Sequence, residues 1–311
     1  MDNSVTCNDD DEDQGLWIAN WGEPTSMTSS KDEISGSYRF KEEKQGAIKE
    51  VMNGKFKALV GQLLKSVGVS SSDQGEKSWV DIVTSLSWEA TSFLKPDAIG
   101  GNAMNPDGYV KVKCIAAGSR SQSQLIKGLV FKKHAAHKHM PTMYKNPRLL
   151  LISGVLSHSL NRLSAFDSMD QEKDDLKYKM DRIEICHPNV ILVERIISRD
   201  IQESILAKRM TLVLDMKLHR LQRVARCTGS PILSCDDLNG QKLRYYDSIY
   251  FEKFVEEYDG AVEGGKRFIK TLMFIEGCPT RLGCTILLKG SHSDELKRIK
   301  MPKVKVKKLR P

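Results

Sequence analysis

The first clear pattern of apolar and polar positions predicts two helices. Across residues 46–69, apolar side chains recur every three or four positions, which is typical of an amphipathic helix. A second helical pattern covers residues 78–94, and Pro96 with the glycines at 100–101 ends it. Lysines lie off the first apolar stripe, so that helix could bind a membrane surface or pack against another helix. Packing is the commoner outcome.

From residue 109 onward, the pattern becomes typical of strands. Residues 109–115 alternate apolar side chains with Lys111 and Lys113, as a half-buried strand does. Residues 163–185 are long and polar, which predicts a solvent-facing helix. Short apolar runs predict further strands at 126–132, 148–153, 270–275 and 284–289.

The clearest alternation of strands and helices follows Pro188. Predicted strands and helices occur in the order 190–193, 198–209, 211–215, 218–227 and 231–233, beginning with a strand. Gly229 ends the second of these helices. Such a βαβαβ order implies parallel strands with right-handed crossovers. The fold class predicted for residues 99–298 is therefore α/β.

The two ends of the chain differ in composition from its middle. Residues 1–45 include the acidic block Asp9–Asp13 and a Ser-rich stretch, which predict a disordered acidic region. Residues 297–311 contain eight Lys or Arg and no acid. We divide the chain into a disordered N-terminal region (1–45), a helical segment (46–98), an α/β domain (99–298) and a basic tail (299–311).

Charge and cysteine usage narrow the class of protein. The net charge of +8 equals that of the last fifteen residues, so it gives no sign of a basic folded face, and we expect no nucleic-acid partner. Apolar runs are far too short to cross a bilayer, and the acidic start is unlike a secretory leader. Seven scattered cysteines favour reduced thiols in the cytoplasm over a disulfide framework.

No catalytic or cofactor-binding residue is predicted. The segment Gly260–Arg267 is close to the P-loop pattern of phosphate-binding proteins. However, Arg267 occupies the position of the Ser or Thr that would bind magnesium, and the residues that follow have a strand pattern where a P-loop is followed by a helix. We therefore interpret this segment as a Gly-rich hairpin turn. The sequence also lacks the G-x-G-x-x-G pattern of dinucleotide-binding folds and the G-x-S-x-G pattern of esterases.

Two clusters of chemically active side chains remain. His134, His137 and His139 form an H-x-x-H-x-H pattern that could gather a metal or attract anionic headgroups. No carboxylate stands beside them and lysines do, so a polar loop after a strand is the favoured interpretation and no metal ligand is assigned. Cys227 and Cys235 could lie near each other, although burial is the usual role of such cysteines.

Three segments resemble group II chaperonins. Residues 218–230 look like the L-x-R-I-A-x-x-T-G helix of their apical domains, and residues 190–203 look like the strand and helix that precede it. Residues 284–290, Cys-Thr-Ile-Leu-Leu-Lys-Gly, are similar to the chaperonin strand T-I-L-L-R-G. The resemblance implies a core like a chaperonin apical domain.

Upstream segments narrow the resemblance to PIKfyve-type 1-phosphatidylinositol-3-phosphate 5-kinases, plant members in particular. The similar segments, within a resemblance that covers about 41–300, are residues 79–90, 94–97, 109–114 and 127–133. In that family a chaperonin-like domain precedes a distant lipid kinase domain. The kinase domain, the cysteine array of a zinc finger and the Gly-Asp-Gly-Thr motif of chaperonin ATPases do not occur in these 311 residues.

The resemblance carries expectations about function. It implies a regulatory, protein-binding region that contacts a scaffold protein and a phosphoinositide phosphatase at endosomal or vacuolar membranes. We expect no kinase activity, because ATP and magnesium are implied only for the missing kinase domain. The alternatives are a chaperone-like holdase, and a membrane-surface binder that uses the 46–69 helix and the basic tail. Residues 301–311 match nothing in the family, so we expect a truncated gene model or read-through sequence, with a real short isoform as the alternative.

Overall fold

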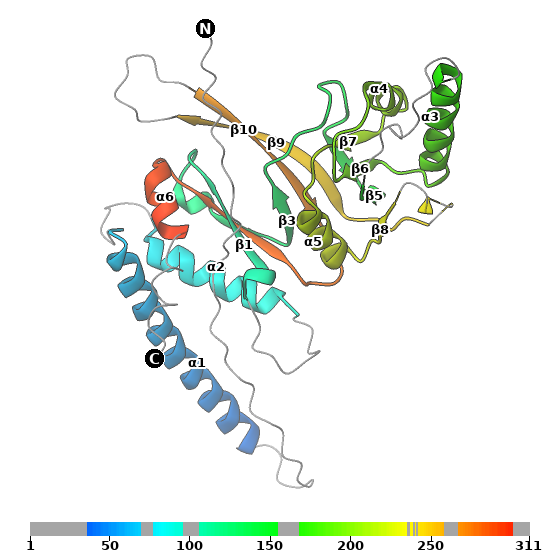
Figure 1. Cartoon of the computed structure of the whole chain (residues 1–311). Helices are drawn as coiled ribbons and strands as arrows, with labels where there is room; N and C mark the ends of the chain where they lie inside the picture. The colour runs from blue at the N-terminus through cyan, green and yellow to red at the C-terminus, as the bar shows by residue number, and fades with distance from the viewer. Residues whose placement is uncertain are drawn as a thin grey trace, which may run out of the picture.

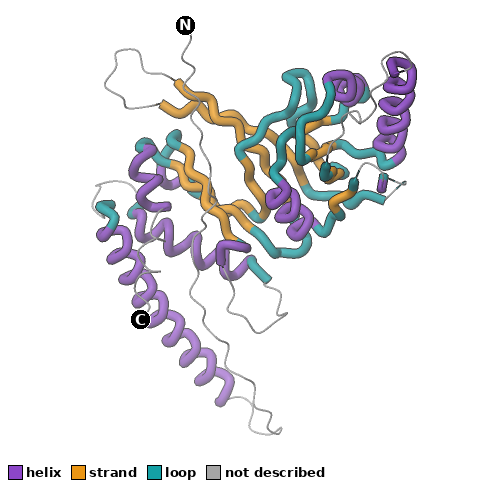
Figure 2. The backbone as a smooth tube through the Cα atoms, viewed as in Figure 1, coloured by secondary structure: helices purple, strands orange, loops and turns teal. Residues whose placement is uncertain are grey.

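A computed structural model describes residues 36–69, 77–95, 106–154, 168–234, 237–238, 240, 242–257 and 267–300. Within these ranges the strands form three sheets, and helices pack on the first and third of them (Figure 1, Figure 2). The predicted α/β class is confirmed. The acidic block, the turn at 260–266 and residues 301–311 lie outside the described residues. None of the described helices is long and apolar enough to span a bilayer.

The first sheet joins segments that are far apart in the chain. β1 is parallel to β11, with Val110 beside Cys284, and β2 is antiparallel to β11 on its other edge. Three helices share one hydrophobic core with this sheet, so the segment predicted at 46–98 is packed with it and does not stand apart. The layer consists of α1 (Gly36–Ser66), α2 (Trp79–Phe93), β1 (Val110–Ile115), β2 (Gln124–Ile126), β11 (Cys284–Lys289) and α6 (Ser293–Lys300).

Helices α1 and α2 pack on each other through their apolar faces. Val60 and Leu64 of α1 are buried, and Phe56 contacts Trp88 of α2 edge to face, with ring centroids 5.9 Å apart. This confirms packing as the role of the predicted apolar stripe. Ser78 caps α2 by accepting a hydrogen bond from the backbone N–H of Val80 at 3.2 Å.

Two predicted boundaries are wrong. Helix α1 begins at Gly36, so residues 36–45 are helical where disorder was predicted. These residues are rich in Glu, Lys and Gln, whose helix propensity extends the helix beyond its apolar stripe. At the other end, helix α6 continues to Lys300 and buries Ile299, so the first residues of the predicted basic tail belong to the fold.

The second sheet is antiparallel and lies between the other two layers. Its strand order is β3-β10-β9-β4, and β9 and β10 pair as a hairpin from Ser248 beside Glu276 to Glu257 beside Arg267. This pairing agrees with the hairpin turn predicted for the intervening glycines. Strands β4 and β9 were not predicted. The strands are β3 (Gly128–Phe131), β4 (Met143–Lys145), β9 (Ser248–Glu257) and β10 (Arg267–Glu276).

The third sheet is parallel, in the order β7-β6-β5-β8, which confirms the predicted βαβαβ unit. Every residue of β5, β6 and β7 is buried, as continuous apolar strands between two layers should be. Gly229, with φ of 69°, ends α5 in the left-handed conformation. The elements are β5 (Leu149–Ile152), α3 (Ser168–Ile185), β6 (Val190–Val193), α4 (Arg199–Ala207), β7 (Thr211–Val213), α5 (Leu218–Thr228) and β8 (Ile232–Leu233).

Alternate residues of the parallel strands face two different cores. Leu149 and Leu151 of β5 pack in a core with α5 and the antiparallel sheet. Leu150 and Ile152 pack in a core with α3 and α4 on the opposite face. Helix α5 therefore packs in the core that the parallel and the antiparallel sheets share.

A buried hydrogen bond joins the end of α5 to the antiparallel layer, and its loss is expected to be measurable. The phenol of Tyr246 bonds to the Ser230 hydroxyl and lies 3.4 Å from the carbonyl oxygen of Thr228. Tyr246→Phe should lower the free energy of unfolding by about 1–2 kcal/mol in chemical denaturation, because the Ser230 hydroxyl stays buried without this partner. The adjacent Tyr245 is 63% exposed, and Tyr245→Phe should change stability by less than about 0.5 kcal/mol. Equal effects of the two changes would contradict the prediction.

Candidate functional site

Helix α5 presents an apolar face to the core and a basic face to solvent. Leu221, Val224 and Cys227 are completely buried. Counted from the first basic side chain, the others follow one, four and seven positions later, so all of them share the other side of the helix. They are His219, Arg220, Arg223 and Arg226.

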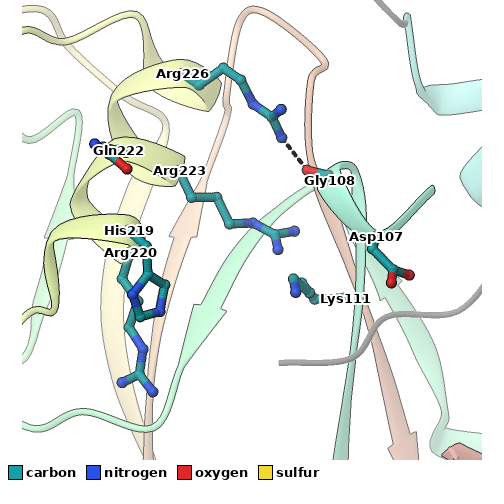
Figure 3. A pocket seen from close by; sticks show the side chains of 8 residues that line it. All are labelled: Asp107, Gly108, Lys111, His219, Arg220, Gln222, Arg223 and Arg226. Carbon is teal, nitrogen blue, oxygen red and sulfur yellow. Dashed lines mark hydrogen bonds between the residues drawn. The ribbon is translucent and has the colours of Figure 1, made fainter. Parts of the chain in front are cut away.

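The basic face of α5 forms one wall of a groove with a cavity of about 390 Å³. The opposite wall comes from the short 3-10 helix η1 (Pro106–Gly108) and from Lys111 of β1 (Figure 3). The groove therefore brings together residues from two layers of the fold that are far apart in the sequence.

Two arginines of α5 reach across the groove and join its walls. The Arg226 guanidinium donates a hydrogen bond to the carbonyl oxygen of Gly108 (Figure 3). It also lies over the Tyr109 ring, 5.0 Å from the centroid. Arg223 donates to the carbonyl oxygen of Tyr109 at 3.4 Å. These contacts fix the spacing between α5 and the start of β1.

The lining of the groove is strongly positive. Three arginines and Lys111 face a single carboxylate, that of Asp107, among the lining residues in the described part of the chain. Clustered guanidinium groups bind oxyanions, because each presents a planar fork of N–H donors. No residue of this groove was predicted as a site. The spacing of arginines on the predicted helix was a usable signal, whereas the opposite wall had no local signature.

The histidine cluster lies in the loop that follows β3, as the favoured interpretation predicted. His134 Nδ1 is 2.8 Å from the carbonyl oxygen of Ala135, and the rings of His137 and His139 are 5.1 Å apart. Across the described residues, no three His, Cys, Asp or Glu side chains are arranged to hold a metal. The loop is anchored by Lys133, whose ammonium group contacts the Asp215 carboxylate at 3.2 Å.

Buried cysteines lie beneath the groove and are poor nucleophiles. Burial raises the pKa of the Cys227 thiol. It raises the pKa of Cys278 to about 12, with Cys227 adding to the rise. Burial also raises the pKa of Cys284 to about 12, against the opposing charge of Arg223. The predicted proximity of Cys235 to Cys227 concerns a residue outside the described part of the chain.

We expect iodoacetamide at pH 8 to leave Cys278 and Cys284 unmodified in the folded chain. A thiol with a pKa near 12 is about 10⁻⁴ thiolate at that pH, and only the thiolate reacts. Mass spectrometry of the labelled protein would locate the adducts, with denatured protein as the fully reactive control. Labelling of either residue at the rate of the denatured chain would contradict the burial of these thiols.

The same thiols should make stability fall at high pH. The unfolded chain loses thiol protons near pH 9, whereas the folded chain keeps the Cys278 proton until about pH 12. The stabilisation is complete below pH 9 and is lost as the pH rises to about 12. Denaturation as a function of pH should show a smaller fall for Cys278→Ala than for the unaltered chain, and an identical pH profile would contradict this.

Comparison with known families agrees with the arrangement of the layers. The family model of the TCP-1/cpn60 chaperonin family matches residues 34–302. The chain belongs to this family. The open-state monomer of a group II chaperonin from Methanococcoides burtonii has a TM-score of 0.50 and 21% identity, covering 78% of this chain and 54% of that one. The chaperonin-family chain thus has a mixed α/β fold resembling a group II chaperonin.

The chain is also similar in sequence to proteins named as 1-phosphatidylinositol-3-phosphate 5-kinases. It is 50% identical over 295 residues to the putative 1-phosphatidylinositol-3-phosphate 5-kinase FAB1D of Arabidopsis thaliana, which is 94% of this chain and 20% of the relative. It is 45% identical over 298 residues to the kinase FAB1A of the same plant, covering 94% and 17%. The human 1-phosphatidylinositol 3-phosphate 5-kinase is 34% identical over 250 residues, covering 78% and 11%.

These relatives confirm the resemblance to PIKfyve-type kinases, including its likeness to plant members. The chain matches their chaperonin-like region and spans about one fifth or less of their length.

Proposed function

We propose that the chain acts as the regulatory, protein-binding chaperonin-like region of a phosphatidylinositol-3-phosphate 5-kinase family protein, without catalysis of its own. The observation that carries this proposal is the 50% identity to a plant family member over 94% of the chain. The proposed partners are the scaffold protein and the phosphoinositide phosphatase implied by the family resemblance. The proposed place of action is the cytoplasmic side of endosomal or vacuolar membranes.

The part of the chain that we compare to a chaperonin apical domain is residues 99–298. In it, the β9–β10 hairpin extends beyond the strands that flank it, since β3 pairs only with Met273–Glu276 of β10 and β4 only with Ser248–Tyr250 of β9 (Figure 1). Its outer half carries exposed apolar side chains, and Val255 is paired directly with Ile269. Exposed apolar side chains on a rigid strand pair are suited to binding a protein partner.

Reconstitution with purified partners tests this proposal. We expect the 311-residue chain to co-elute with the family scaffold protein and phosphatase, and to yield no bisphosphate product from ATP and phosphatidylinositol 3-phosphate. Ile269, 68% exposed, is replaced by Asp in the test variant, and Ile196, 70% exposed on another layer, is replaced by Asp as a matched control. Co-elution should be lost only with Ile269→Asp. Absence of a complex, or formation of bisphosphate, would overturn the proposal.

A further inference from the structure

The groove between α5 and β1 has the chemistry of a site for several phosphate groups. Its charged lining residues are four permanent cations and one carboxylate, and they gather around one cavity. Gathering like charges costs electrostatic free energy in the folded protein. A bound polyanion would turn that repulsion into attraction.

The side chains that would contact such a ligand are already held in place. Arg226 is fixed by the Gly108 carbonyl oxygen and the Tyr109 ring, and Arg223 by the Tyr109 carbonyl oxygen. Arranged donors lose little conformational freedom when a ligand binds. A guanidinium group carries five N–H donors, so the hydrogen bond of Arg226 to the Gly108 carbonyl oxygen leaves others that an oxyanion can accept from.

Arg220 adds a cation whose side chain has no partner among the described residues. It is half-buried in the groove lining, and its guanidinium makes no hydrogen bond, ion pair or ring contact with the described residues. Its guanidinium points away from that of Arg226 (Figure 3). The two residues are six positions apart on one helix, which separates them by about 9 Å along its axis. The positive charge is therefore spread along the groove rather than focused on one point.

We propose that this groove binds a small molecule that carries several phosphate groups. A spread of cations over about 9 Å suits phosphates distributed around a ring or along a short chain better than one phosphate ion. The cavity of about 390 Å³ is within the range of small-molecule sites. The phosphates could belong to a soluble compound or to a lipid headgroup, since the recognised chemistry is the same.

Calorimetric titration of the full chain with myo-inositol hexakisphosphate tests the site. Arg220→Gln on the helical wall and Lys111→Gln on the strand wall should each weaken binding about tenfold or more, because each removes a charge-assisted contact. Arg199→Gln is the matched control. It removes one positive charge from the exposed face of α4, far from the groove lining, where Arg199 contacts Glu203 at 3.2 Å. The control should retain the affinity of the unaltered chain.

The source of the phosphates is distinguished by a second arm. Inorganic phosphate should bind much more weakly than the hexakisphosphate if the groove contacts several phosphate groups of one ligand at the same time. Vesicles of phosphatidylcholine with phosphatidylinositol 4,5-bisphosphate, compared with phosphatidylcholine alone, test a headgroup that carries several phosphates. The proposal is supported if the chain binds the hexakisphosphate or the acidic vesicles and if both groove variants weaken that binding.

Three results would overturn the proposal. The first is that the chain binds neither the hexakisphosphate nor the acidic vesicles. The second is that Arg199→Gln weakens binding as much as the groove variants do. The third is that only one of the two groove variants, Arg220→Gln or Lys111→Gln, weakens binding. Melting curves show whether each variant is folded, and Arg220→Lys keeps the charge if Arg220→Gln does not fold. The inference goes beyond the proposed function, because complex formation through the β9–β10 hairpin is measured without the phosphate ligand.

Discussion

Replacing Trp79 by alanine is expected to lower the free energy of unfolding by about 3–5 kcal/mol. Its indole is 1% exposed at the centre of the core that joins α1, α2 and α6 to the first sheet. Arg120 lies over the ring, 5.5 Å from its centroid. Truncation leaves a large cavity between elements that are not covalently adjacent, so the whole layer loses packing. Chemical denaturation measures the change.

Two further variants separate packing from hydrogen bonding at this position. The indole nitrogen of Trp79 is buried and has no hydrogen-bond partner among the described residues. Trp79→Phe therefore removes ring volume but no such bond, and it should cost much less than Trp79→Ala. Trp88 lies on the same helix and is 37% exposed, and Trp88→Ala should cost about 1 kcal/mol. An equal loss in the free energy of unfolding for Trp88→Ala and Trp79→Ala would contradict the prediction that burial of the Trp79 ring causes the larger effect.

The second large effect is expected from Gly128→Ala. Gly128 opens β3 and pairs with Glu276 of β10, where an added methyl group would overlap the carbonyl oxygen of Ile275 and lie 3.0 Å from Cα of Glu276. Both obstacles are backbone, so the strands must separate. The Gly128 carbonyl oxygen also accepts a hydrogen bond from the Thr285 hydroxyl at 3.0 Å, which links β3 to β11. We expect a loss of about 3 kcal/mol or more.

A glycine with open surroundings provides the control for this change. Gly54 lies inside α1, and an added methyl group there meets nothing within 4 Å. Gly54→Ala should stabilise the chain by up to about 1 kcal/mol, because alanine loses less backbone entropy in a helix. Denaturation midpoints that shift in the same direction for both variants would show that steric contact is not the cause at Gly128.

The parallel layer could be predicted from the sequence because its strands are short, continuous apolar runs separated by amphipathic helices. Strand β9 could not. Ile249 and Phe251 pack on one core, while Tyr250 and Phe254 pack on another. Apolar side chains therefore occupy both faces, and the alternation that marks a half-buried strand is lost.

Only one wall of the groove, the basic face of α5, could be predicted from the sequence. The arginine spacing on α5 is a local signal that the residues themselves carry. Lys111 and η1 are more than a hundred residues earlier in the chain, and tertiary contacts place them opposite α5, among them the hydrogen bonds from Arg223 and Arg226. Strand β4 is three residues long and largely exposed, so it had no pattern to detect.

The parallel pairing of β1 with β11 also sets an order of events during folding. Val110 cannot meet Cys284 until the intervening chain, which contains the antiparallel and the parallel sheets, has collapsed enough to bring its two ends together. Contacts at such sequence separation form slowly. The first sheet should therefore acquire protection from amide hydrogen exchange after β5 and β6, whose partners are closer in sequence. On a ribosome, its completion must wait until β11 has been synthesised.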